Sequence, residues 1–254
     1  MGRKNLIKMG LGIILNNPSL IPKLFTLDFD NIYCSYWKLK LKKAKKMYEE
    51  FENSEKDIFN VINSINQTIL NEKYSRHEAF FIPIYFMIRI KKPRIIVETG
   101  VHRGVSSLFI LQALEDNNEG NLFSIDLPLA EYEVKEGIHT ASNLVKEKVG
   151  ICVSNNLKKR WNLILGDSKK ELPNVLKDKE NIDFFLHDSQ HTFEHMIWEY
   201  ETIWPKLIKN GLLVSDDINW NNAFQNFCDK VDCDNIKLKR DNLPSGLFGV
   251  IVKK

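Results

Sequence analysis

Short apolar runs alternate with stretches of helical spacing along most of the chain, and this pattern predicts an α/β fold. Residues 95–97 form an apolar run that ends at Glu98, and the chain then passes through two glycines into the helical pattern of residues 105–114. Further apolar runs predict strands at 120–126, 161–165, 182–187 and 212–215. Two extended segments close the chain around a turn, at 236–240 and 247–252.

Stretches with three- and four-residue apolar spacing predict helices before and between these strands. They lie at 54–70, 76–91, 169–177, about 193–208 and about 220–232. A length of 254 residues suits one α/β domain with an extension. We interpret residues 1–75 as a helical N-terminal extension and residues 76–254 as the main domain.

The composition is that of an ordinary soluble globular protein, with 43% hydrophobic and 27% charged residues. A formal net charge of +3 does not by itself indicate a nucleic-acid partner. The positive charge is concentrated in residues 1–50, so the rest of the chain is mildly acidic. This distribution argues against a nucleic-acid groove and favours a small-molecule site. The four cysteines have no zinc-type spacing, and reduced thiols in a cytoplasmic protein are the default expectation.

The first 25 residues combine basic residues with an apolar run that resembles the start of a signal peptide. No small-residue cleavage site follows, Lys8 interrupts the run, and the run is too short to span a bilayer. We favour a helix that packs on the main domain or on a second subunit of a homo-oligomer. With the basic run at 37–46, peripheral contact with a membrane surface is the alternative.

The glycine turn after the first strand carries the most specific chemistry. It reads Glu98-x-Gly100-x-x-x-Gly104, not the G-x-G-x-x-G of a dinucleotide site. Glycine lets a ligand approach the backbone, and a helix start offers free N–H groups. The turn resembles motif I of class I S-adenosylmethionine-dependent methyltransferases, with His102 in place of the middle glycine. A βα turn of some other α/β protein is the alternative.

Two later positions fit the same cofactor. Asp126 ends the second strand about 20 residues after the glycine turn, where an acidic residue can bind a ribose diol. Asp167 and Ser168 follow the third strand, and they resemble the family motif that contacts the adenine ring. Helix capping is the alternative for each acidic residue, and both roles can hold together.

Carboxylates follow the fourth and fifth strands, at Asp188, Asp216 and Asp217. Clustered carboxylates repel one another unless a cation lies between them, and oxygen ligands suit Mg²⁺. The spacing Asp188-x-x-His191 resembles the macrocin- and mycinamicin-type metal-dependent sugar O-methyltransferases. The resemblance implies a metal site at the three carboxylates and His191 as the general base.

The resemblance implies a Rossmann-like class I methyltransferase fold, with a seven-stranded, mostly parallel sheet that ends in an antiparallel C-terminal hairpin. It implies cofactor contacts from these residues: Glu98, Thr99, Gly100, Val101, Gly104, Ser106, Asp126, Asp167, Ser168 and Asp188. His191 and Asp188 are the expected catalytic residues. The implied activity is S-adenosylmethionine-dependent O-methylation of a hydroxyl on a small molecule or a glycan, assisted by Mg²⁺.

Several alternatives stay open at this point. The chain could be a cofactor-binding module without turnover, or a metal-independent methyltransferase that acts on another atom, such as nitrogen. A nicotinamide dehydrogenase is disfavoured by the missing fingerprint and by the closing strand pair. Zinc at His187, His191 and His195 is also disfavoured, because His187 ends a strand and does not share a helical face with the other two.

Overall fold

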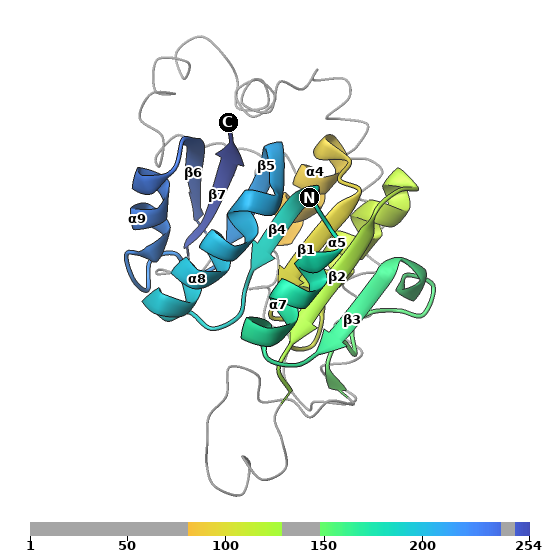
Figure 1. Ribbon diagram of the computed structural model, residues 1–254. Coiled ribbons are helices and arrows are strands. Elements are labelled where there is room, and N and C mark those ends of the chain that lie inside the picture. The colour runs from red at the N-terminus through yellow and green to blue at the C-terminus, as the bar shows by residue number, and fades with distance from the viewer. Residues whose placement is uncertain (1–80, 129–147, 240–246) are drawn as a thin grey trace, which may run out of the picture.

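The computed structural model describes residues 81–128, 148–239 and 247–254. Within these ranges it contains a seven-stranded sheet with the strand order β3-β2-β1-β4-β5-β7-β6 (Figure 1). The strands are β1 (Ile95–Thr99), β2 (Asn121–Asp126), β3 (Trp161–Leu165), β4 (Ile182–His187), β5 (Leu207–Ser215), β6 (Cys233–Lys239) and β7 (Leu247–Lys253). Strands β1 to β5 run parallel, whereas β7 is antiparallel to both β5 and β6. The predicted fold class is therefore confirmed.

Helices cover both faces of the sheet and create two separate cores. On one face, α4 (Phe81–Lys91) and α5 (Val105–Asn117) pack against apolar side chains of β1, β2, β4 and β5. On the other face lie α7 (Ser168–Lys177), α8 (Phe193–Ile203) and α9 (Ala223–Lys230) (Figure 1). Successive side chains of a strand point to opposite faces, so every central strand contributes to both cores.

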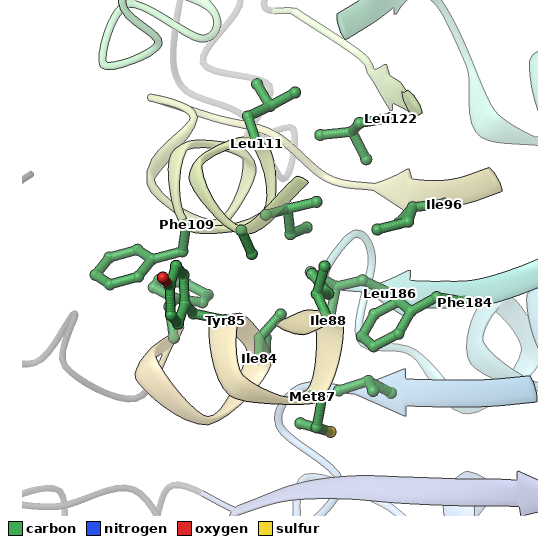
Figure 2. Close-up of a cluster of buried hydrophobic side chains, with 14 of the residues drawn as sticks. Ile84, Tyr85, Met87, Ile88, Ile96, Phe109, Leu111, Leu122, Phe184 and Leu186 are labelled. Atoms are coloured by element: carbon green, nitrogen blue, oxygen red, sulfur yellow. The ribbon is translucent and has the colours of Figure 1, made fainter. Parts of the chain in front are cut away.

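Figure 2 shows how α4 joins the first core. Side chains of this apolar helix, among them Ile84 and Ile88, lie between α5 and the sheet and are fully buried. Burying one such aliphatic side chain stabilises a fold by roughly 1.5–3 kcal/mol. The Tyr85 hydroxyl donates to Asp116 of α5, and Arg89 donates to the Tyr85 oxygen at 2.9 Å. These polar contacts fix the position of α4 along α5.

The structure corrects the boundary between α8 and β5. The predicted helix at 193–208 ends at Ile203, a 3₁₀ turn follows at Trp204–Lys206, and β5 starts at Leu207 rather than at 212. Pro205 has no N–H for a helical hydrogen bond, and Leu207 pairs with Ile182 of β4. Lys253 Nζ donates to the carbonyls of Trp204 and Leu207, both at 2.7 Å, and so satisfies the end of the turn.

Other boundaries shift by a few residues. The helix predicted at 220–232 spans Ala223–Lys230, and the strand predicted from 236 starts at Cys233. The helical extension at 1–75, its membrane contact and its contact with a second subunit fall on residues outside the described ranges. Among the described helices, none has the length and apolar character that crossing a membrane requires.

Candidate active site

The glycine turn lies where the ends of β1 and β4 come into contact. The amide of Asp188 donates to the Thr99 carbonyl at 2.8 Å. A Cβ on Gly100 would lie 1.8 Å from the Asp188 carbonyl oxygen, and Gly100 has a left-handed φ of +84°. Both observations require glycine at this position. His102, which replaces the middle glycine of the motif, also adopts a left-handed φ of +50°.

Asp126 holds this turn with one carboxylate oxygen. Its Oδ1 accepts hydrogen bonds from the amides of Val101 at 2.7 Å and His102 at 3.1 Å. Its Oδ2 is buried and has no hydrogen-bond partner among the described residues. A buried acceptor without a partner is unfavourable, so this oxygen fits a hydroxyl donor of a ligand. The geometry agrees with the predicted ribose contact, which stays a prediction.

Glu98 and Ser106 occupy a different place from the one expected of cofactor ligands. The side chain of Glu98 is 0% exposed, and it accepts hydrogen bonds from Ser106 at 2.5 Å, Ser107 at 2.6 Å and Ser124 at 2.7 Å. Burial raises the pKa of Glu98, the serine hydroxyls lower it, and nearby Asp126 raises it again, with a net upward shift. This geometry argues against a direct ligand contact by either side chain. We call Glu98, Ser106, Ser107 and Ser124 the Glu98 cluster.

Asp167 caps α7, which was the alternative to its adenine contact. Its Oδ1 accepts from the Lys169 amide at 2.9 Å. The Ser168 hydroxyl lies 3.1 Å from Nε2 of His195 on α8 and so ties the two helices together. The adenine contact itself stays a prediction.

His191 lies between two carboxylates at the ends of β4 and β5. Its Nε2 is 3.7 Å from Oδ1 of Asp188, and its Nδ1 is 3.9 Å from Oδ2 of Asp217. The rings of His187 and Trp220 pack edge-on against the imidazole, with centroids 5.2 and 5.3 Å away. The ring is therefore held in place with an acidic group near each nitrogen, which would stabilise it after it accepts a proton.

The three carboxylates predicted to bind a metal do not converge on one point. Oδ1 of Asp216 accepts from the Asp217 amide at 2.8 Å, and the His191 ring separates Asp188 from Asp217. Burial raises the pKa of Asp217, and the nearby His187 opposes that shift. In the part of the chain that the structure describes, no group of three or more His, Cys, Asp or Glu side chains is arranged to hold a metal ion. The arrangement of these three carboxylates therefore does not fit the predicted Mg²⁺ site.

The sequence interpretation missed Glu199, a buried residue of α8 beside the site. Its side chain is 0% exposed and accepts four hydrogen bonds. The donors are Thr99, His187, Ser189 and His195. A signal was present in the sequence, because Glu199 lies among the apolar positions that form the buried face of α8. We call Glu199 and these four residues the Glu199 cluster.

The comparisons with known proteins agree with the fold. Residues 97–218 match a family model described as a methyltransferase domain. A Staphylococcus aureus protein provisionally assigned as a caffeoyl-CoA O-methyltransferase aligns with a TM-score of 0.55 and 16% identity, over 83% of this chain and 98% of that one. The comparison with curated proteins found no match.

Two ligand-bound structures are also similar. The O-methyltransferase TomG of Streptomyces achromogenes, involved in tomaymycin synthesis and bound to S-adenosylmethionine, has a TM-score of 0.54 and 13% identity over 78% of this chain and 89% of that one. A Bacillus cereus O-methyltransferase in complex with S-adenosylhomocysteine has a TM-score of 0.51 and 14% identity, over 78% and 90%. Residues 97–218 thus match a methyltransferase domain, and the chain shares the fold of these O-methyltransferase structures.

Proposed function

We propose that this chain is an S-adenosylmethionine-dependent enzyme that methylates a hydroxyl group of a small molecule or a glycan, with His191 as the general base. The position of His191 between Asp188 and Asp217 carries this proposal, because a base needs groups that stabilise its protonated form. The similar solved structures are described as O-methyltransferases, which supports oxygen as the acceptor atom.

Each half of the site has a separate task in this reaction. Bound S-adenosylmethionine supplies an electrophilic methyl group on a sulfonium. On the cofactor side, Asp126 Oδ2 and the turn from Gly100 to Gly104 are the groups that fit the ribose and the methionine moiety. On the acceptor side, His191 would take the proton of the acceptor hydroxyl. The hydroxyl oxygen would form its bond to the methyl carbon as the carbon–sulfur bond breaks and the sulfur leaves as a neutral thioether. Asp188 and Asp217 would stabilise the imidazolium. Holding the two reactants in line supplies much of the acceleration.

Magnesium assistance has less support than the base. The carboxylates from which it was predicted are separated by His191, and Asp216 Oδ1 is bound to a backbone amide. We therefore propose proton transfer to His191 without a step through a metal. Activity measured after EDTA treatment, and again after adding back Mg²⁺, tests this point: a reversible loss of activity would restore the metal site.

Calorimetry followed by a turnover assay tests the function. We expect the enzyme to bind S-adenosylhomocysteine in about the micromolar range that is common for enzyme substrates, and Asp126→Ala to lose that binding. His191→Ala should keep the affinity but lose roughly 100-fold or more of the turnover with a panel of phenols and sugars. A parent protein that binds the cofactor and methylates nothing would favour the non-catalytic module, and methylated amines would favour a nitrogen acceptor.

A further inference from the structure

The carboxylate of Glu199 connects the cofactor side of the site, at Thr99, with the acceptor side, at His187 and Ser189. Its Oε2 accepts from Thr99 Oγ1 at 2.6 Å and His187 Nδ1 at 2.7 Å. Its Oε1 accepts from Ser189 Oγ at 2.9 Å and His195 Nε2 at 2.9 Å. Burial raises the pKa of Glu199, but the contacts with His187 and His195 together lower it by more than burial raises it, so the net shift is downward. The carboxylate therefore carries no proton at neutral pH, and all four partners act as donors.

The residues that Glu199 holds are the immediate neighbours of the site residues. Thr99 directly precedes Gly100 of the cofactor turn, and His187 and Ser189 flank Asp188. Thr99 and His187 are also paired in the register of β1 and β4. One side chain thus fixes the end of the strand that carries the cofactor turn and the end of the strand that leads to His191.

Stability alone is a poor explanation for a charge at this place. Removing a carboxylate from water is unfavourable by several kcal/mol, and a buried ion pair is often no more stable than apolar residues of similar volume. The neighbouring buried positions of α8, Met196, Tyr200 and Ile203, are filled by apolar or aromatic side chains. A charged acceptor provides four directional contacts that these residues cannot make. They reach the ends of β1 and β4, the loop after β4, and a neighbouring turn of α8.

We propose that Glu199 is a positioning residue. It sets the cofactor turn and the loop at residues 188–192, which carries His191, relative to each other. This inference rests on the proposed function, because it assigns the two loops to the methyl donor and to the base. A displacement of about 1 Å between reacting groups can slow a reaction by about 100-fold, so the contacts of Glu199 act mainly on the chemical step.

The Glu199→Gln variant tests the proposal, since one of its two oxygens becomes an NH₂ group that cannot accept a hydrogen bond. We expect kcat to fall by about tenfold to 100-fold, and the Kd for S-adenosylhomocysteine to rise by less than about tenfold. The matched control is Glu201→Gln on the same helix, where the side chain is exposed and bound to Lys230. That control should keep the parental kcat. A kcat loss that only matches a lower folded fraction in thermal unfolding would overturn the proposal.

Smaller changes keep the proposal testable if Glu199→Gln does not fold. Thr99→Val removes the donor on the cofactor side, and Ser189→Ala removes the donor beside Asp188. We expect Thr99→Val to raise the cofactor Kd more than it lowers kcat, and Ser189→Ala to do the reverse. Parental values of both constants in both variants would overturn the proposal.

Failure of the proposed function gives a different result. A parent protein that does not bind S-adenosylhomocysteine would contradict the proposed function. Nitrogen NMR of the parent would still test the contacts themselves, because the geometry requires a proton on Nδ1 of His187 and on Nε2 of His195. An unprotonated nitrogen at either position would overturn the proposed contacts.

Discussion

Two fully buried carboxylates lie on opposite faces of the sheet, and their surroundings make them opposite in character. Glu98 receives three neutral serine hydroxyls, and its pKa is raised. Glu199 receives two hydroxyls and two imidazoles, and its pKa is lowered. Burial is complete in both cases, so the donors decide whether the charged form is favoured.

The two clusters also differ in how far along the chain they reach. Ser106 and Ser107 follow Glu98 by 8 and 9 residues, so part of the Glu98 cluster forms within one βα unit. Thr99 and Glu199 are 100 residues apart. Glu98 therefore supports the local geometry of the cofactor turn, whereas Glu199 joins separate units of the fold. Four predictions test this contrast.

The largest effect is expected from Gly100→Ala, because Gly100 lies beside both clusters. The added Cβ would meet the Asp188 carbonyl oxygen at 1.8 Å in a left-handed backbone. Overpacking and strain together should lower the free energy of unfolding by about 4 kcal/mol. Urea denaturation measures this loss. In the control Gly166→Ala, φ is not left-handed and the nearest atom belongs to the flexible Glu171 side chain. A loss as large in the control would contradict the interpretation.

The second prediction compares Glu199→Gln with Glu98→Gln. Removing the charge from a buried pair with histidine should lower the free energy of unfolding by about 3 kcal/mol. Glu98→Gln should lower it by about 1 kcal/mol, because serine hydroxyls can rotate to new partners and the raised pKa already disfavours the charge. Equal losses in urea denaturation at neutral pH would remove the distinction between the clusters.

The third prediction concerns pH, where the two signs differ. The pKa of Glu199 lies below its ordinary value of 4.5 in the folded state, so its stabilisation is present above 4.5 and is lost as the pH falls further. The pKa of Glu98 lies above 4.5, so stability should rise as the pH falls through that pKa towards 4.5. A tenfold difference in acid dissociation constant between the folded and unfolded states corresponds to about 1.4 kcal/mol of stability.

Unfolding curves from neutral pH down to about 3.5 would separate the two contributions. In Glu199→Gln, the free energy of unfolding should fall less at low pH than in the parent. In Glu98→Gln, the rise in the free energy of unfolding between neutral pH and 4.5 should be absent. A parental pH profile in both variants would show that neither carboxylate titrates as its surroundings indicate.

The smallest effect is expected from Ser106→Ala. The change removes one hydroxyl donor from Glu98 and should lower the free energy of unfolding by about 1 kcal/mol. Because Ser106 is buried against Glu98, the affinity for S-adenosylhomocysteine should stay at the parental value. Calorimetry checks this point. A tenfold weaker affinity would instead support the cofactor contact that was predicted for Ser106 from the sequence.

Much of the fold could be predicted because its strands are short, apolar and clearly bounded. β3 and β4 have the predicted bounds, since a polar or glycine residue follows each run. The start of β5 could not be predicted, because Leu207 continues the helical spacing of α8. Its strand pairing with Ile182 and its carbonyl contact with Lys253 depend on residues far away in the sequence.

The site shows the same limit. Asp126, Asp188 and Asp217 lie at the C-terminal ends of parallel strands. Their positions at the strand ends in the sequence were enough to predict that they lie on the same side of the sheet. Sequence reasoning could not show that Oδ1 of Asp126 is used by the turn, that His191 separates two carboxylates, or that Glu98 faces serines. These outcomes depend on which face each side chain takes and on three-dimensional contacts.

The contact between Thr99 and Glu199 has a consequence for the order in which the protein is made. A nascent chain already contains the glycine turn and Asp126 long before the ribosome reaches α8. Until Glu199 leaves the exit tunnel, the hydroxyl of Thr99 lacks this acceptor, although β4 precedes α8 in the chain and can already pair with β1. A product truncated before α8 therefore carries the glycine turn without the carboxylate that holds Thr99, and we expect its ability to bind a ligand to appear only once α8 has been made.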